Sequence, residues 1–490
     1  MTVMKTPGVY IVEKNTFPNS VVEVATAVPA FIGYTEFAKN GTEDITGKPW
    51  RITSMAEFHA YFGGAPIPKF SILTNTIHDY TGIKYTAKHT LYYQMRFFFA
   101  NGGGACYIVS VGSYNDDLHS DQFIKGIETL LKEQEPTMLV VPEAVNLGDA
   151  ACKNVQEAML KHCGCDTLSR FAILDVWNGN KDKGDPEAGD VITKFRDSIG
   201  NNYLNFGAAY YPWLNTSILQ DSDITLANFD ETSLKSLENI LINQLNNDLS
   251  LKTDRKEELK NKYAELNAKE CDKTELHKTL YATSAIYHNI VKDALFQVNC
   301  LPVSAAMAGI YTMVDNTRGV WKAPANVSIA NVVSPAVNLA NADQEDLNVP
   351  VNGKAINAIR SFVGEGIMVW GARTLDGNSL DWRYINVRRT MIMLEESVKN
   401  ATRAYVFELN VANTWVNIKS MISNFLNGIW KRGGLAGSSP EDAYNVHVGL
   451  GETMTPEDIL EGIMRVTVLV AVARPAEFIE ITFQQQMQKS

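Results

Sequence analysis

The sequence is poor in cysteine, has no excess of basic residues and contains no apolar segment suited to a bilayer. Its 490 residues hold 44 Lys and Arg against 55 Asp and Glu, which gives a formal net charge of −11. Nucleic-acid binders usually present a basic face, so we expect no nucleic acid among the partners. The six cysteines follow no disulfide-framework spacing, which indicates a reducing compartment.

Targeting signals are also scarce. The first residues, MTVMKTPGVYIVEKN, lack a basic segment that leads into an apolar core, so we expect no secretory signal and synthesis in the cytoplasm. The longest uncharged stretch, 323–342, is long enough for a membrane span but contains Pro324, Pro335 and four Asn, which are costly in lipid. We therefore expect no direct membrane insertion.

What is present is the composition of a globular protein. With 45% hydrophobic and 20% charged residues, the chain is near the average for folded domains. At ~150 residues per domain, this length predicts about three structural units.

The middle of the chain alternates apolar strands with amphipathic helices. This alternation is typical of a parallel sheet covered by helices, so the expected fold class is α/β. Strands are expected at 138–141, 171–176 and 204–211, and helices at 151–162, 191–199 and 303–314.

An inserted helical region is expected at about 226–285. Leucines there recur at spacings of three and four, from Leu234 to Leu266, which predicts a helical hairpin. Charges flank both sides of the apolar stripe, so a solvated helix pair packed on its own domain is favoured over a membrane-surface or partner helix.

Elements outside this middle are also predicted. A helix from Met55 to Tyr61, capped by Thr53 or Ser54, is followed by a helix at 91–100 and a strand at 106–111. Later in the chain we expect helices at 389–410 and 416–430, then strands at 466–472 and 478–484.

Two glycine and serine motifs resemble enzyme sites. Ser54 in the sequence TSMA is similar to the nucleophile of subtilisins, but no His precedes it, and a helix cap explains it better. Gly102, Gly103 and Gly104 follow a helix instead of preceding one, so they predict a helix end and a tight turn, not a phosphate loop.

Two further motifs bear on metal and acid chemistry. His162, Cys163 and Cys165, with Cys152 upstream, lack the spacing of a zinc knuckle. Asp175 ends an apolar strand but has no partner motif, so a turn-forming role is expected. We therefore expect no catalytic residue, no metal, no cofactor and no enzymatic activity.

The two ends of the chain carry a different signal. Ile479, Ile481 and Phe483 alternate with Glu480 and Thr482, as in a strand with one apolar face. Two short β-like runs near the N-terminus, 9–13 and 20–25, hold too little apolar area to fold alone.

Such strands expose backbone groups that a neighbouring subunit can pair with. Exchange of this kind uses two different surfaces, so it generates rings or helical filaments. The residues predicted to exchange are Val9, Tyr10, Ile11, Val12, Val22, Val24, Phe478, Ile479, Ile481 and Phe483.

Five segments together resemble the contractile tail sheath family of myophages, R-type bacteriocins and extracellular contractile injection systems. No single segment is specific for this family, but the five segments in this order are. They are PGVY at 7–10, FFANGGGACYIVSV at 98–111, DNTRGVWKAPAN at 315–326, RTL at 373–375 with WRYINVRR at 382–389, and RPAEFIEITF at 474–483.

The resemblance implies a helical homopolymer of stacked rings around an inner tube protein, bounded by baseplate and terminal cap proteins. It implies contraction that drives the tube through a target membrane, and a subtilisin-like core without a catalytic triad. It also implies a place in a phage tail or tail-like particle, which is released from the cell or anchored to a membrane.

We expect five parts on this basis. They are an N-terminal arm at 1–28, an N-terminal part at 29–111, the α/β core at 112–380, a C-terminal α+β domain facing the tube at 381–477, and a C-terminal arm at 478–490.

Local positive charge in an acidic chain suggests the tube contact. Lys419, Lys431 and Arg432 are the candidate residues, and ordinary solvated side chains are the alternative. Two other functions remain open at this point: a cytoplasmic α/β hydrolase-like enzyme and a static, non-contractile tail or capsid protein.

Overall fold

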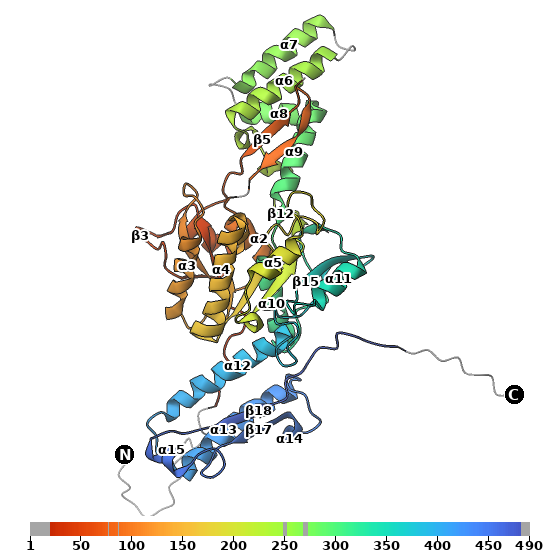
Figure 1. The fold of residues 1–490 in the computed structure, drawn as a ribbon. Helices are drawn as coiled ribbons and strands as arrows, with labels where there is room; N and C mark the ends of the chain where they lie inside the picture. Colours follow the sequence, from red (N-terminus) through yellow and green to blue (C-terminus); the bar gives the residue numbers. More distant parts are fainter. Residues whose placement is uncertain (1–19, 77, 87, 248–251, 268–272, 482–490) are drawn as a thin grey trace, which may run out of the picture. The chain divides into compact units, whose positions relative to one another are not determined.

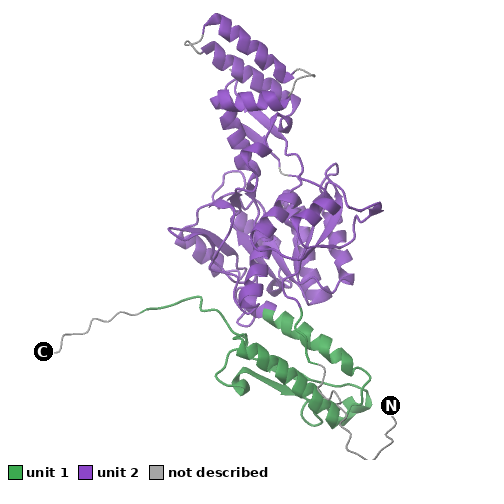
Figure 2. Cartoon of the chain, turned by 180° about the vertical axis from the view of Figure 1, so that it is seen from behind, with its two compact units in different colours: residues 1–24, 390–490 green, residues 25–389 purple. Residues whose placement is uncertain are grey.

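The computed structural model describes residues 20–76, 78–86, 88–247, 252–267 and 273–481. The chain divides into two compact units (Figure 2). Unit 1 comprises residues 1–24 and 390–490, and unit 2 comprises residues 25–389.

Unit 2 is built on a mixed sheet that has nine strands in the described part of the chain. Neighbouring strands from β15 to β7 are parallel, whereas β16 and β4 run antiparallel to the strands beside them. In sheet order the strands are β13 (Val327–Ser328), β16 (Gly366–Val369), β15 (Asn357–Phe362), β10 (Gly207–Tyr211), β9 (Phe171–Asp175), β8 (Met138–Val140), β1 (Pro29–Thr35), β7 (Cys106–Ser113) and β4 (Trp50–Ile52).

The central strands are buried along their whole length. Every residue of β1, β8, β9 and β10 is buried, as expected for parallel strands covered on both faces. Strand β1 was not among the predicted strands, although it lies in the middle of the sheet. The strand begins at Pro29, a position where a strand tolerates proline, and contains Gly33, and both residue types are uncommon in strands.

Helices pack on both faces of this sheet. Ile32 and Gly33 are adjacent in β1 and therefore point to opposite faces. A Cβ on Gly126 of α3 (Ser120–Thr129) would lie 2.8 Å from Ile32, and one on Gly33 would lie 2.9 Å from Leu91 of α2 (Leu91–Ala100). Helix α4 (Asp149–Lys161) packs beside α3, and α10 (Ser304–Arg318) packs beside α2.

A helical subdomain of unit 2 joins two segments that are far apart in the sequence (Figure 1). The hairpin of β5 (Phe70–Thr74) and β6 (Tyr80–Tyr85) packs on the helices of the expected insertion. The Ile72 N–H donates to Ser233 Oγ at 3.0 Å, and the Tyr80 hydroxyl donates to Asp293 at 2.7 Å. The helices are α6 (Glu231–Asn247), α7 (Thr253–Ala264), α8 (Lys273–Thr283) and α9 (Ala285–Val298).

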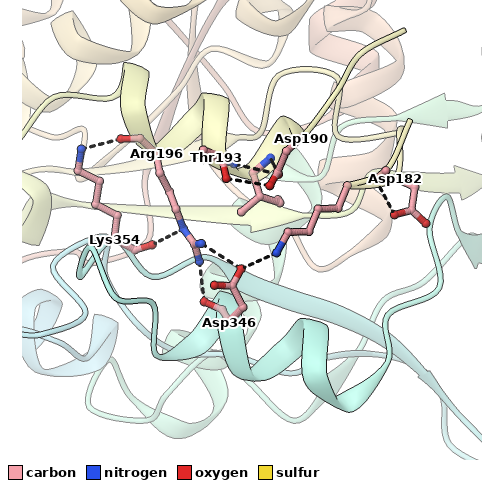
Figure 3. Close-up of polar contacts among 9 residues, drawn as sticks. Asp182, Asp190, Thr193, Arg196, Asp346 and Lys354 are labelled. Carbon is pink, nitrogen blue, oxygen red and sulfur yellow. Dashed lines mark hydrogen bonds and ion pairs between the residues drawn. The ribbon is translucent and has the colours of Figure 1, made fainter. Parts of the chain in front are cut away.

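An ion cluster fastens helix α5 (Val191–Ser198) to α11 (Asn341–Asn348) (Figure 3). The carboxylate of Asp346 lies 3.1 Å from Arg196 and 3.2 Å from Lys183. The buried Arg196 guanidinium also donates to the backbone carbonyl of Lys354, and Lys354 Nζ donates back to the Arg196 carbonyl. The cluster thus satisfies a buried cation with both a carboxylate and carbonyls.

The smaller elements of unit 2 complete its surface. They are β2 (Lys39–Asn40), β3 (Glu43–Asp44), α1 (Met55–Phe62), β11 (Leu214–Thr216), β12 (Cys300–Leu301) and β14 (Val332–Pro335). Strand β10 begins later than predicted because residues 204–206 form a 3-10 turn.

Unit 1 contains two long helices and a small sheet. Helix α12 (Ile385–Thr402) begins in unit 2 and continues into unit 1, where α13 (Ala412–Lys431) follows. The predicted extension of α12 to residue 410 is wrong. Residues 403–405 form a 3-10 turn after Thr402, and Phe407 then adopts a positive φ of 70°, which a right-handed helix does not allow. The remaining elements are α14 (Pro440–Ala443), β17 (Tyr444–His447), α15 (Pro456–Leu460) and β18 (Thr467–Val470).

Candidate assembly site

The serine and glycine motifs have structural roles, as predicted. Ser54 caps α1, and its hydroxyl accepts a hydrogen bond from the Glu57 N–H at 3.3 Å. Gly102 follows α2 with a φ of 89°, in the left-handed region that favours glycine. A Cβ on Gly103 would lie 2.6 Å from the ring of Phe98, so this turn requires glycine.

The histidine and cysteine motif is also structural. The Nε2 atom of His162 lies 2.6 Å from the guanidinium of Arg170. Burial and the nearby positive charge of Arg170 lower the pKa of His162 to about 4, so the ring stays neutral and accepts this hydrogen bond. Cys163 is buried and Cys165 is exposed. Across the described ranges, no group of three or more His, Cys, Asp or Glu is arranged to hold a metal ion.

Asp175 caps a helix instead of forming the expected turn. Its carboxyl group accepts the N–H of Val303 at 2.7 Å and that of Ser304 at 2.8 Å, at the start of α10. Burial raises the pKa of Asp175 to about 6, against the lowering effect of these hydrogen bonds. The strand-end carboxyl is therefore used to position a helix.

Glu143 caps the start of α2 in the same way, and no sequence pattern predicted this role. It is fully buried and accepts the N–H groups of Tyr34, Thr90 and Leu91 at 2.8, 2.6 and 2.9 Å. Burial raises the pKa of Glu143 to about 7. Since α2 and α10 pack on each other, the two carboxyl groups fix one helix pair on the sheet.

A buried ion pair holds the start of α12. The guanidinium of Arg389 contacts both carboxylate oxygens of Asp315, at 2.6 and 2.9 Å, and the two side chains are 4% and 2% exposed. Arg389 also donates to the backbone carbonyl of Thr26 at 2.9 Å and lies 4.7 Å from the ring centroid of Tyr311. Both ends of unit 2, at residues 25 and 389, are therefore fixed at one point.

Two of the segments that carried the family resemblance, 315–326 and 382–389, supply the ion pair and several residues near it. The guanidinium of Arg388 lies 4.1 Å from the ring of Phe206 and 4.6 Å from that of Trp382. The side chain of Asn386 donates to the carbonyl of Trp321 at 2.8 Å. The segments 315–326 and 382–389 thus meet in the structure, a contact that no local pattern indicates.

The small sheet of unit 1 has few partners in the described part of the chain. Strands β17 and β18 pair antiparallel over four residues each, from Tyr444 opposite Val470 to His447 opposite Thr467. An isolated two-stranded sheet is marginally stable, and its outer edges present unpaired backbone groups. This sheet is therefore suited to receive further strands.

An open apolar groove of about 1080 Å³ lies beside β18. Alternate residues of this strand region, Val466, Val468 and Val470, line it. Its other walls are one face of α12, from Met391 to Thr402, and the loop after α12, residues 405–410. The groove has the apolar lining and strand-like periodicity that suit an extended apolar segment.

Four of the five described arm residues are exposed, and the fifth, Val24, is half-buried. Phe478, Ile479 and Ile481 are 75, 79 and 69% exposed, and Val22 is 76% exposed. Residues 20–25, where the sequence predicts a strand, form none, and the Val24 N–H donates to Ser397 Oγ of α12 at 3.1 Å. Val9, Tyr10, Ile11, Val12 and Phe483 lie outside the described residues.

The candidate tube-contact residues do not form one cluster. Lys419 and Lys431 are exposed on α13, and twelve residues of helix separate them by ~18 Å. Arg432 follows the helix and forms an ion pair of 2.5 Å with Glu23. Helix α13 itself contains no Asp or Glu, so its exposed face is neutral to basic.

Of the helices in the described ranges, none has the length and apolarity that crossing a bilayer requires.

Comparison with known proteins points to one family. The family described as phage tail sheath C-terminal domain matches residues 378–486. The tail sheath protein of Vibrio phage KVP40 is 27% identical over 187 residues, which cover 37% of this chain and 26% of that protein. The chain thus aligns with about a quarter of the length of the curated relatives it matches.

Solved structures match along nearly the whole chain. A chain of the PVC sheath complex in the contracted state, from an extracellular contractile injection system, is 29% identical with a TM-score of 0.62, and the match covers 99% of both chains. A chain of the helical sheath of the anti-feeding prophage in the contracted state is 28% identical with a TM-score of 0.62, covering 99% of this chain and 100% of that one. The mixed α/β fold is therefore that of contractile sheath structures.

We predict that Glu143 makes folding depend on pH. The folded state keeps this proton up to about pH 7, whereas the unfolded chain loses it near the ordinary pKa of 4.5. The folded state therefore binds more protons in this window, and its stability falls as pH rises, by at most ~1.4 kcal/mol per pH unit. His162, with its lowered pKa, acts in the opposite direction, so the wild-type chain is compared with Glu143→Gln.

The measurement is urea unfolding of both proteins at intervals from pH 5 to 8. The stability of the wild-type chain relative to Glu143→Gln should fall across this range. A relative stability that rises with pH would contradict the role assigned to Glu143.

We also predict that Asp315→Ala strongly destabilises the fold. The substitution leaves the guanidinium of Arg389 buried without its carboxylate, which costs ~3–5 kcal/mol. Glu43→Ala is the control, because the Glu43–Lys48 pair is more than half exposed and contributes less than ~1 kcal/mol. Chemical denaturation measures both, and equal effects would show that the buried pair has no special role.

Proposed function

Since this chain is similar to contractile tail sheath proteins, we propose that it belongs to their family and is the structural subunit of a contractile sheath. In this role it polymerises as stacked rings around an inner tube and contracts to drive the tube through a target membrane. The observation that carries the proposal is the similarity to contracted sheath chains over 99% of its length. We propose no catalytic activity, because the enzyme-like residues serve as helix caps and turn residues.

The subunits are joined in this proposal by strand exchange. Among the described residues, no further strand pairs with β17 or β18, and Phe478, Ile479 and Ile481 of the C-terminal segment are exposed. Four to six backbone hydrogen bonds at ~0.5–1.5 kcal/mol each and three apolar side chains at ~1.5–3 kcal/mol each suffice to hold neighbours together. The groove beside β18 is the acceptor for the C-terminal segment of a second copy.

The N-terminal arm is proposed to act in the same way from the opposite end. In residues 20–24, the Val24 N–H donates to Ser397 of α12, and Glu23 forms an ion pair with Arg432 at the end of α13. In this proposal the preceding residues, 1–19, pair with a neighbouring subunit. Arms of continuous backbone let subunits rotate and slide during contraction while the polymer stays connected.

The finer architecture is part of the same proposal. Unit 2 corresponds to a subtilisin-like core without a triad, and its sheet draws strands from both sides of residue 112. The helical insertion at about 226–285 forms an outer region, and residues 381–477 face the tube. The proposed limits of the five parts are those given from the sequence.

Other partners and the location follow from the family. We propose an inner tube protein, a baseplate and terminal cap proteins as partners, and neither nucleic acid nor an inserted membrane contact. The chain is made in the bacterial cytoplasm and becomes part of a phage tail or tail-like injection particle.

Deletion of residues 478–490 should leave a soluble, folded protein that forms no extended sheath. Residues 478–481 are exposed and add nothing to the core, so folding is unaffected while the exchange contact is lost. Circular dichroism checks the fold, and electron microscopy of pelleted material checks assembly. Normal cylinders from the truncated chain would refute strand exchange, and a small closed oligomer from the full chain would refute the sheath assignment.

Charge reversal at Lys419, Lys431 and Arg432 should weaken assembly of the sheath on its tube. The triple substitution to Glu replaces attraction to an acidic or polar tube surface with repulsion, and the loss should be largest at low salt. Reversal of the exposed residues Lys39, Lys132 and Lys161 is the control with equal net charge. Co-assembly at several salt concentrations measures the effect, and unchanged assembly of the first variant would reject this contact.

A further inference from the structure

The loop between α12 and α13 exposes an unusual set of apolar side chains. Val406, Phe407 and Leu409 are 60, 102 and 74% exposed, within four consecutive residues. They belong to the loop that forms one wall of the groove beside β18. Apolar side chains gathered this closely on a loop mark an interaction surface.

Phe407 also has a strained backbone. Its φ of 70° lies in the left-handed region, which is uncommon and unfavourable for a residue with a bulky side chain. No contact within the described chain buries its ring, because the residue is fully exposed. A strained residue that gains nothing in the isolated subunit is a candidate for a functional role.

The two ends of this loop are fixed. The Val406 N–H donates to the Arg403 carbonyl at 3.3 Å, which closes the turn after α12. At the other end, the side chain of Asn410 donates to the Ile463 carbonyl at 3.1 Å and accepts from the indole of Trp415 at 2.7 Å. These contacts hold Phe407 at the rim of the groove instead of letting it collapse elsewhere.

We propose that this loop clasps the C-terminal strand of a second copy once that strand lies in the groove, with the Phe407 ring packed over it. The inference rests on the strand exchange proposed above. It adds that residues of the loop, outside the sheet, also contact and hold the exchanged strand. Burial of Phe407, Val406 and Leu409 against the incoming strand then compensates for the strain at Phe407.

The C-terminal segment is the better occupant of the two arms. Residues 20–24 are already engaged with their own unit, through the Val24–Ser397 hydrogen bond and the Glu23–Arg432 ion pair. Phe478, Ile479 and Ile481, in contrast, are exposed in their own chain. Ile479 and Ile481 are two residues apart, as are Val466, Val468 and Val470 in the groove wall. A strand added beside β18 would therefore present its apolar side chains on the same face as these valines.

Two substitutions in the full chain separate the ring from the backbone. Phe407→Ala removes the ring and keeps the strain, whereas Phe407→Gly removes the ring and relieves the strain. Both should raise the concentration needed for sheath assembly about tenfold or more, since each loses the burial of a phenyl ring. Leu460→Ala is the matched control, because Leu460 is 87% exposed in unit 1 but does not line the groove.

Sedimentation of assembled sheath over a concentration series gives the readout, with thermal melts to confirm folding. Wild-type behaviour of Phe407→Gly would overturn the clasp, since the ring would then be dispensable. Ile479→Asp distinguishes the two proposals. If it assembles normally, strand exchange fails; if it is blocked while both Phe407 variants assemble normally, only the clasp fails.

A crosslink tests the contact directly. In a Cys165→Ser background, which removes the exposed thiol of the described residues, Phe407→Cys combined with Ile479→Cys should give a ladder of covalent oligomers on oxidation. Leu460→Cys with Ile479→Cys should give none. Equal ladders from both pairs, or none from the first, would contradict the proposed position of the strand.

Discussion

The buried pair between Arg389 and Asp315 is the interaction on which the rest of the structure depends. It fixes the first turn of α12, and through the carbonyl of Thr26 it also fixes the point where the N-terminal segment joins unit 2. The chain passes from unit 1 into unit 2 between residues 24 and 25, and back into unit 1 between residues 389 and 390. In a polymer that contracts while its arms stay connected, this point has to be rigid, and a bidentate pair removed from water provides that rigidity.

The two units have opposite physical characters, and the proposed function needs both. Unit 2 is self-sufficient: its central strands are fully buried, and the carboxyl groups of Glu143 and Asp175 satisfy the helix ends that meet the sheet. Unit 1 has a two-stranded sheet, an open apolar groove and exposed apolar side chains at the end of the chain. In the proposal, other copies of the chain cover these surfaces. The stable fold of unit 2 is then what allows unit 1 to keep surfaces that only assembly buries.

Sequence reasoning succeeded where structure is local. The cap at Ser54, the turn at Gly102 and the helices at 91–100 and 416–430 follow from signals within a few residues, and they are present. It failed at β1, whose seven residues include Pro29 and Gly33, and at the end of α12, where the positive φ of Phe407 has no sequence signature. It also missed contacts across long separations, such as Ile72 with Ser233 and Asp315 with Arg389, because no local pattern specifies which distant residues meet.

The central claim is that subunits are linked by exchanged strands. The most direct measurement is a cryo-electron microscopy map of cylinders formed by the full-length chain, traced through residue 483. The account predicts continuous density for residues 478–483 alongside β18 of a neighbouring copy, with Phe407 of that copy over it. Density that returns to unit 1 of its own chain, or a particle with no contact between arms and neighbours, would contradict it.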